Sequence, residues 1–256
     1  MNRIDNAFKR LKESNKKALV PFVTCGDVSV EKTAELIKEI YEVGGDIVEI
    51  GVPFSDPLAD GEIIQESYNR ALKNCTKLKD VFKCVELVRS TCEIPLILMT
   101  YYNVIYCYGV ERFLKEAMDK GVDGLIVPDI PLEERAELMR ICDENNIYLI
   151  PLVAPTSKER ISKIVKNSKG FVYCVSTNGT TGERSTVNSN IDEYLNMVRE
   201  YTKIPILVGF GISSRETVAK IKNHCDGVII GSAIVKRMMK GNEEVIEFLR
   251  DVNEEL

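Results

Sequence analysis

Glu49 is the residue whose type and position most clearly indicate chemistry. It lies inside the apolar run 46–51, and short runs of this kind are typical of buried strands, whose side chains alternate between two sides of a sheet. The neighbouring strand ends carry Thr24, Tyr101 and Asp129 and supply no lysine or arginine. Burial without a cationic partner raises the pKa of a carboxyl group and suits it to acid–base catalysis near neutral pH. We therefore predict that Glu49 is catalytic; the alternative is a structural carboxyl group held in an ion pair.

Asp60 is the second acidic candidate. It lies in a loop that Pro53 and Pro57 stiffen, directly before a helix predicted to begin near Gly61. A carboxyl group at this position could cap the helix, because aspartate is a favoured N-cap residue. It could equally act together with Glu49, since this loop follows the strand that carries Glu49. The residues alone leave these two interpretations open.

Other kinds of catalysis lack their usual residues. The single histidine, His224, stands at the end of a predicted helix just before a strand. In a parallel α/β barrel, residues at the N-terminal ends of the strands contribute to stability, whereas the active site lies at the C-terminal ends. Ser–His–Asp catalysis and histidine-ligated metals are therefore disfavoured, and we expect no metal. No lysine stands at the C-terminal end of a predicted strand, which disfavours a Schiff-base aldolase. Acid–base work must fall to carboxyl groups or tyrosines.

Eight apolar, β-branched runs must position these side chains, and amphipathic helical segments separate them. The runs are 18–24, 46–51, 95–101, 124–129, 148–153, 171–176, 205–211 and 227–232. Buried strands that alternate with helices indicate a parallel sheet. Eight such units without a linker favour a closed (β/α)₈ TIM barrel over an open doubly wound sheet. We predict a single α/β domain spanning 1–256, with an extra N-terminal helix over about 2–14 at the lower end of the barrel.

Glycine-rich turns follow the last two predicted strands. Residues 209–213 and 231–233 each end a strand and open a helix, and backbone N–H groups at helix N-termini bind anions without a basic side chain. Barrels often bind phosphate with the loops after strands seven and eight. The predicted phosphate site comprises Gly182, on the long loop after the sixth strand, with Gly211, Gly231 and Ser232. The predicted apolar wall for the rest of the substrate comprises Phe22, Ile64, Met99, Tyr101, Ile126, Leu152, Phe210 and Ile229, although core packing is an alternative for some of them.

Composition and charge disfavour several other classes of protein. The net charge is −5 and no run of lysine or arginine forms a basic stripe, so we expect no nucleic-acid binding. No apolar run approaches the roughly 18 residues of a membrane span, and the charged residues 1–17 do not resemble a signal peptide. The eight cysteines include no C-x-x-C pair. We interpret them as the reduced thiols of a cytoplasmic protein.

Residues 49–61, followed by Ile64 and Gln65, resemble the signature of the tryptophan synthase alpha chain family. Segments 21–24, 128–131, 181–182, 209–213 and 231–236 resemble its other motifs in order, so the resemblance covers essentially the whole chain. It implies a lyase that cleaves indole-3-glycerol phosphate to indole and glyceraldehyde 3-phosphate by a retro-aldol reaction. The same resemblance implies that Glu49 transfers the protons and that Asp60 accepts a hydrogen bond from the indole N–H. It further implies that Tyr173 orients the substrate and that Thr181 closes a loop over the site.

The resemblance also implies a partner. Members of the family pair with a beta chain that carries pyridoxal phosphate and takes the indole, in an α₂β₂ heterotetramer, so this chain is expected to need no cofactor of its own. The implied contact rim comprises Pro53, Asp56, Pro57, Asn103 and Pro131. Two other functions remain open at this point. One is a lyase or isomerase for a different phosphorylated substrate, and the other is a non-catalytic subunit that only activates a partner.

Overall fold

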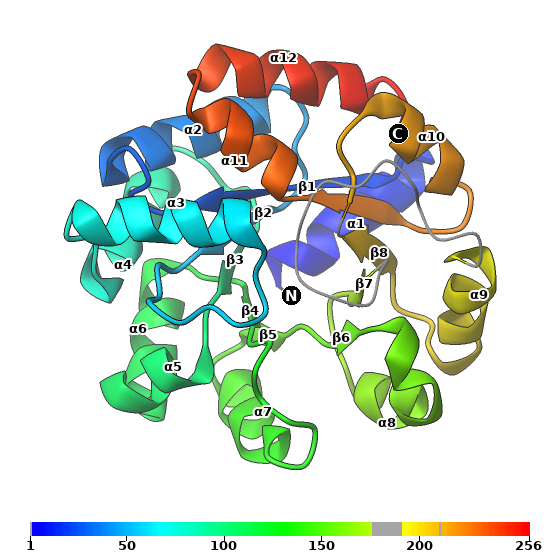
Figure 1. The fold of residues 1–256 in the computed structure, drawn as a ribbon. Helices are drawn as coiled ribbons and strands as arrows, with labels where there is room; N and C mark the ends of the chain where they lie inside the picture. Colours follow the sequence, from blue (N-terminus) through cyan, green and yellow to red (C-terminus); the bar gives the residue numbers. More distant parts are fainter. Residues whose placement is uncertain (1, 176–190, 210) are drawn as a thin grey trace.

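The computed structural model describes residues 2–175, 191–209 and 211–256. Its strands form one parallel sheet that curls into a ring, with helices around the outside (Figure 1). The strands are β1 (Ala18–Thr24), β2 (Val48–Gly51), β3 (Leu96–Met99), β4 (Gly124–Ile126), β5 (Tyr148–Leu149), β6 (Leu152–Val153), β7 (Val172–Val175), β8 (Ile206–Gly209) and β9 (Gly227–Ile230).

The ring closes through β5 and β6, which are the two ends of the strand order β5-β4-β3-β2-β1-β9-β8-β7-β6. Only Ile150 and Pro151 separate them in the chain. The Ile150 N–H donates to the Leu125 carbonyl oxygen, and the Pro151 carbonyl oxygen accepts from the Tyr173 N–H. The predicted strand 148–153 is therefore split, because proline has no N–H for the ladder. It still binds its neighbours on both sides and acts as the fifth strand of an eight-stranded barrel. The predicted TIM barrel is confirmed.

Helices cover the outside of the ring, and the segment between β2 and β3 holds two of them. The helices are α1 (Arg3–Ser14), α2 (Val30–Glu42), α3 (Glu62–Lys73), α4 (Leu78–Arg89), α5 (Tyr102–Tyr108), α6 (Val110–Lys120), α7 (Arg135–Glu144), the 3₁₀ helix η1 (Pro155–Arg160), α8 (Ile161–Val165), α9 (Ile191–Tyr201), α10 (Arg215–Ile221), α11 (Ser232–Met238) and α12 (Asn242–Asn253). No helix among the described residues is long and apolar enough to cross a membrane.

The additional N-terminal helix α1 lies at the end of the barrel where the strands begin. Its N-cap residue Asn2 accepts from the Ile4 N–H and donates to the carbonyl oxygens of Asp123 and Asn146, which lie one and two residues before β4 and β5. Ile4, with Ala7 and Leu11, is buried on the same face of the helix. This end is therefore sealed, which leaves the C-terminal ends of the strands for a site.

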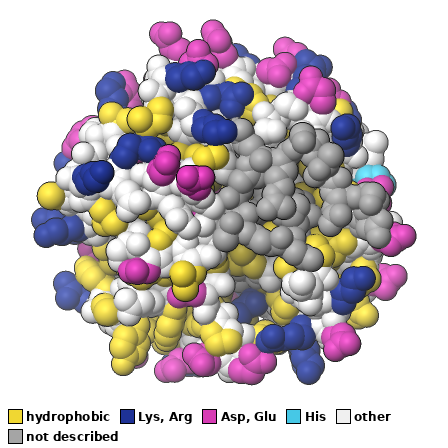
Figure 2. All heavy atoms as spheres, in the orientation of Figure 1, with side chains coloured by type: hydrophobic (Ala, Val, Ile, Leu, Met, Phe, Trp, Pro, Cys, Tyr) yellow, Lys and Arg dark blue, Asp and Glu magenta, His cyan; other side chains and the backbone are white. Residues whose placement is uncertain are grey.

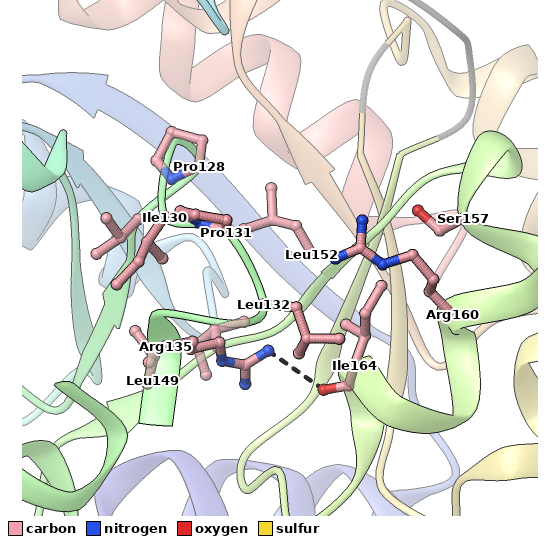
Figure 3. A pocket seen from close by; sticks show the side chains of 12 residues that line it. Pro128, Ile130, Pro131, Leu132, Arg135, Leu149, Leu152, Ser157, Arg160 and Ile164 are labelled. Atoms are coloured by element: carbon pink, nitrogen blue, oxygen red, sulfur yellow. Dashed lines mark hydrogen bonds between the residues drawn. The ribbon is translucent and has the colours of Figure 1, made fainter. Parts of the chain in front are cut away.

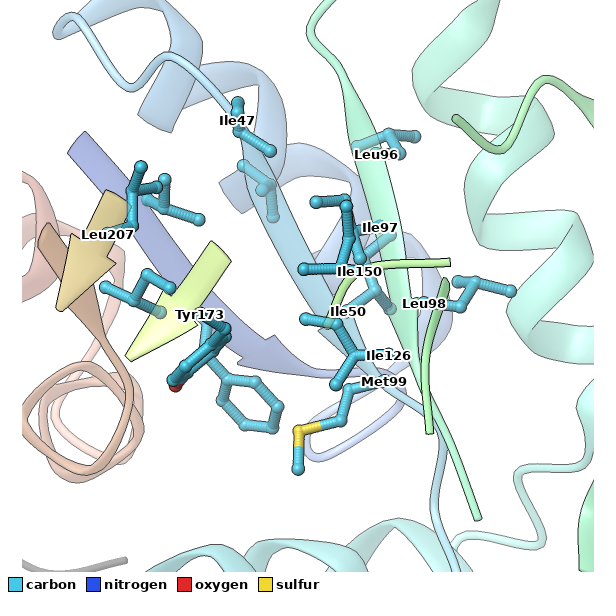
Figure 4. Packing of buried hydrophobic residues seen from close by; sticks show 14 of the residues in the cluster. Ile47, Ile50, Leu96, Ile97, Leu98, Met99, Ile126, Ile150, Tyr173 and Leu207 are labelled. Atoms are coloured by element: carbon cyan, nitrogen blue, oxygen red, sulfur yellow. The ribbon is translucent and has the colours of Figure 1, made fainter. Parts of the chain in front are cut away.

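Strand alternation fills the interior of the ring. Ile97 and Leu98 leave β3 on opposite sides, and Met99 and Tyr173 gather on the inner side (Figure 4). In the parallel register Phe22 pairs with Glu49, and Glu49 pairs with Ile97. Paired residues of neighbouring strands point to the same side of a sheet. Glu49 therefore shares the inner side with Ile97, above a core of apolar side chains.

Candidate active site

Glu49 is a buried carboxyl group on the inner side of β2, and its side chain is part of the barrel mouth. The residue is only 1% exposed. Its Oε1 has no hydrogen-bond partner among the described residues, and none of their ion pairs includes Glu49. Burial, and then the charge of Asp60, raise the pKa of Glu49 to about 8. The predicted rise in pKa is therefore confirmed, and the ion-pair alternative finds no partner in the described part of the chain.

Asp60 belongs to the same cluster and does not cap a helix. The N-cap of α3 is Gly61, which has no side-chain capping bond, so the N-cap interpretation is wrong. Asp60 is instead turned inward, where the Tyr101 hydroxyl donates to its Oδ2 at 2.6 Å. Burial raises its pKa to about 6, although the hydrogen bond from Tyr101 opposes that rise. Since its charge acts on Glu49, the two carboxyl groups form one electrostatic unit.

Tyr101 holds the loop that carries Asp60. Its hydroxyl accepts from the Ala59 N–H at 3.0 Å while donating to Asp60, and the ring of Phe54 stacks on its own ring at a centroid distance of 5.0 Å. Sequence reasoning placed Tyr101 in an apolar wall and missed this polar role. No local pattern could have found it, because Asp60 lies 41 residues away in the chain.

Most residues of the predicted apolar wall are buried around these carboxyl groups. Phe22, Ile64, Met99, Ile126 and Ile229 are all at most 6% exposed. Tyr173 lies across the end of β8, where a Cβ added to Gly209 would stand 2.4 Å from its hydroxyl oxygen. Burial, and then the charges of Glu49 and Asp60, raise the pKa of Tyr173, so this tyrosine lies near both carboxyl groups. Phe210 lies outside the described residues.

Leu152 lines a neighbouring pocket of about 290 Å³, which also includes Pro131 of the predicted rim (Figure 3). Arg135 enters this pocket from α7 and donates to the Ile164 carbonyl oxygen at 3.2 Å. Neither Glu49 nor Asp60 lines it.

The two glycines of the predicted phosphate site differ in their surroundings. Gly231 directly precedes α11 as its N-cap, as predicted. Gly211 does not open a helix, because α10 begins at Arg215 with Ser214 as its N-cap. Gly211 has φ +81°, a conformation that other residues rarely adopt. Ser232 is half-buried and begins α11. Thr181 and Gly182 lie outside the described residues.

The predicted rim is only partly accessible. Asp56, Asn103 and Pro131 are exposed, Pro53 is half-buried and Pro57 is buried. The neighbouring Leu58 was missed, although it is 86% exposed. An isolated leucine between polar and small loop residues was the available signal.

Three further observations concern the surface charge, the possible metal ligands and the single histidine. Acidic and basic side chains are interspersed on the face shown in Figure 2, with no broad basic patch among the atoms described there. In the described part of the chain, no three histidine, cysteine or acidic side chains come together as possible metal ligands. His224 Nε2 lies 3.5 Å from Asp192 Oδ1, near the start of β9 and away from the mouth.

Comparisons with known proteins show which family the chain resembles. The family model for the tryptophan synthase alpha chain matches residues 8–255. The chain is 62% identical over its full length to the full-length tryptophan synthase alpha chain of Clostridium beijerinckii. Among solved structures, it is 32% identical to tryptophan synthase subunit alpha from Legionella pneumophila, with a TM-score of 0.90 and coverage of 100% and 98% of the two chains. A Mycobacterium tuberculosis tryptophan synthase chain is also 32% identical, with a TM-score of 0.93 and coverage of 99% and 98%.

Proposed function

The chain belongs to the tryptophan synthase alpha chain family, lyases that cleave indole-3-glycerol phosphate to indole and glyceraldehyde 3-phosphate, and we propose that Glu49 and Asp60 carry out the acid–base chemistry of this reaction. The observation that supports this assignment most directly is the pair of buried carboxyl groups, one on β2 and one on the loop that follows it, with pKa values raised to about 8 and about 6. At neutral pH such a pair holds one proton on Glu49 and a negative charge on Asp60.

The proposed mechanism uses the proton on Glu49 and the negative charge on Asp60. Glu49 donates its proton to C3 of the indole ring, and the ring nitrogen becomes positively charged. Asp60 accepts a hydrogen bond from the indole N–H and stabilises that charge. The ionised Glu49 then removes the proton of the side-chain hydroxyl. The carbon–carbon bond breaks, its electron pair returns to the ring, and a carbonyl group forms. Glu49 regains its proton, so the step needs no cofactor in this chain.

The remaining predicted residues take supporting roles in this proposal. Tyr101 positions Asp60, while Tyr173 and the apolar wall orient the indole ring. The backbone N–H groups at Gly211, Gly231 and Ser232, with Gly182 on the loop after β7, bind the phosphate, and Thr181 closes that loop over the substrate. The charge on a phosphate is favoured at the N-terminal end of α11.

Purified chain, assayed alone for indole release from indole-3-glycerol phosphate, tests the proposal. We expect slow but measurable release that persists after EDTA treatment and after borohydride treatment in the presence of substrate. EDTA removes metals and borohydride reduces imines, and the acid–base mechanism uses neither. Loss of activity with either reagent, in protein that remains folded by circular dichroism, would contradict this mechanism.

Gly231→Val is expected to raise KM by at least about tenfold with a smaller change in kcat. A Cβ at Gly231 would stand 3.8 Å from Phe22 and 3.9 Å from Ile64, which is ordinary contact distance. The added side chain therefore intrudes on the ligand more than on the protein, and tenfold corresponds to about 1.4 kcal/mol of lost binding. Steady-state kinetics measures it, with Ser232→Ala as a milder comparison. A normal KM would place the phosphate elsewhere.

We further propose that the chain works in the cytoplasm as the alpha subunit of an α₂β₂ complex, with pyridoxal phosphate on the beta chain. The similar M. tuberculosis structure is that of tryptophan synthase. The exposed residues Asp56, Leu58, Asn103 and Pro131 surround the mouth from which indole must leave. A partner bound on this rim would receive indole without its release to water.

A further inference from the structure

Helix α3 is fixed over the mouth of the barrel by polar contacts with the end of β1. The Ser67 and Thr24 hydroxyl oxygens are 2.6 Å apart. The Arg70 guanidinium donates twice to the fully buried carboxylate of Asp27, at 2.6 and 2.9 Å. In Figure 1 the helix crosses in front of the strands on the β1–β2 side. Its inward face, which includes Tyr68, is therefore held in place.

Tyr68 is packed against the strand that carries Glu49. A Cβ added to Gly51 would stand 2.9 Å from Cε1 of Tyr68 and 2.4 Å from Cζ of Phe22. Glycine at this position lets both rings approach the backbone of β2. Glu49 and Gly51 are two residues apart and share one side of that strand. The Tyr68 ring therefore lies over the same side of β2 as the Glu49 side chain.

The Tyr68 hydroxyl and Glu49 Oε1 are both buried, and neither has a hydrogen-bond partner among the described residues. A third such oxygen belongs to Thr100, which directly follows β3. Because side chains alternate along an extended segment, Thr100 is directed to the other side from Met99, toward the outside of the barrel. Leaving a buried polar group unpaired is unfavourable and uncommon in native proteins, and a catalytic role is one of its known explanations. Here one group is a donor and the other an acceptor.

The charges around Glu49 favour this pairing. The titratable groups that interact with it are Asp60 from the loop, Tyr68 from α3 and Tyr173 from β7. Tyr101 already donates to Asp60. Burial, with the charges of Asp60, Tyr101 and Glu49, raises the pKa of Tyr68 well above its usual value. Tyr68 therefore keeps its proton and remains a hydrogen-bond donor throughout the working pH range.

We propose that Tyr68 is a positioning residue for Glu49, whose carboxylate accepts a hydrogen bond from the Tyr68 hydroxyl while Glu49 is ionised. This inference rests on the proposed acid–base role of Glu49. After Glu49 gives its proton to C3, the Tyr68 hydroxyl stabilises one carboxylate oxygen and leaves the other directed at the substrate hydroxyl. The proton of Tyr68 is not transferred. When Glu49 takes the hydroxyl proton, the hydrogen bond weakens and the cycle is complete.

Tyr68→Phe tests the inference, because it keeps the ring against Gly51 and removes only the hydroxyl. We expect kcat to fall about tenfold with little change in KM, because a hydrogen bond to a charged group is lost. We also expect the alkaline limb of the kcat–pH profile to move up by about one pH unit, because one pKa unit is the same tenfold effect. Tyr106→Phe on α5, where the tyrosine is 68% exposed, is the matched control.

Two further measurements distinguish the possible failures. 3-Fluorotyrosine incorporated at position 68 is a stronger donor and should move the alkaline limb to lower pH, which a purely structural role would not do. If Tyr68→Phe lowers kcat without moving that limb, or leaves both unchanged, the inference is wrong. If Glu49→Gln remains active, the proposed function itself is wrong. An inactive Glu49→Gln combined with an unmoved limb would overturn only the role of Tyr68.

Discussion

Glu49→Gln is expected to lower the rate of indole formation by at least about 10²–10⁴-fold, while substrate analogues still bind. The amide keeps the shape of the side chain and removes only its ability to transfer protons, and such groups contribute factors of this size. No other described carboxyl group is positioned to replace it, because Asp60 is held by Tyr101. Single-turnover assays and analogue titration measure the two effects separately. Residual turnover close to that of the natural chain would overturn the assigned role.

The same variant has an expected effect on stability that excludes unfolding as the cause of its inactivity. The pKa of Glu49 rises from 4.5 to about 8 on folding. Folding therefore favours the protonated carboxyl group. Its contribution is fully present below about pH 4.5 and is lost as the pH rises through 8. Glutamine cannot ionise, so the free energy of unfolding of Glu49→Gln should exceed that of the natural chain more at pH 9 than at pH 5. Urea unfolding at the two pH values measures this difference.

The architecture could be predicted because buried strands appear in the sequence as short runs of apolar residues. The run 18–24 is β1 over its whole length, since all its residues are buried. The run 46–51 forms a shorter strand, because Asp46 uses its carboxylate to accept from the Leu19 N–H and from Arg10. The apolar pattern did not predict that the strand 148–153 is interrupted at Pro151 and counts as β5 and β6. The missing N–H of proline did indicate such an interruption.

A candidate site residue could be predicted where its type is unusual for the sequence around it. It could not be predicted where its role depends on contact with a residue far away in the chain. An acidic side chain within a buried strand made Glu49 a candidate from local pattern alone, and its burial and raised pKa agree with that prediction. Asp60 remained ambiguous because its partner, Tyr101, comes from another strand. Tyr68 was missed because its hydroxyl matters only through its proximity to Glu49. Its position four residues after Ile64 did indicate that both face the barrel.

Addition of a beta chain should accelerate indole-3-glycerol phosphate cleavage by this chain, and Leu58→Glu should weaken that complex by about 10–100-fold. Asp60 is carried on a loop and not on a strand, so its position relative to Glu49 depends on what holds the loop. Leu58 lies two residues before Asp60 and is 86% exposed. Burying a leucine side chain contributes about 1.5–3 kcal/mol, which corresponds to that range of affinity.

The isolated Leu58→Glu chain should keep its own rate, because the side chain contacts water in the free protein. Tyr201→Glu is the matched control, since Tyr201 is 51% exposed and ends α9, at the opposite end of the barrel from the mouth. Titration calorimetry gives the affinity, and cleavage assays with and without the beta chain give the stimulation. Equal binding by both variants would mean that the beta chain docks away from the rim. A fast isolated chain that forms no complex at micromolar concentrations would instead indicate a lyase that releases indole on its own.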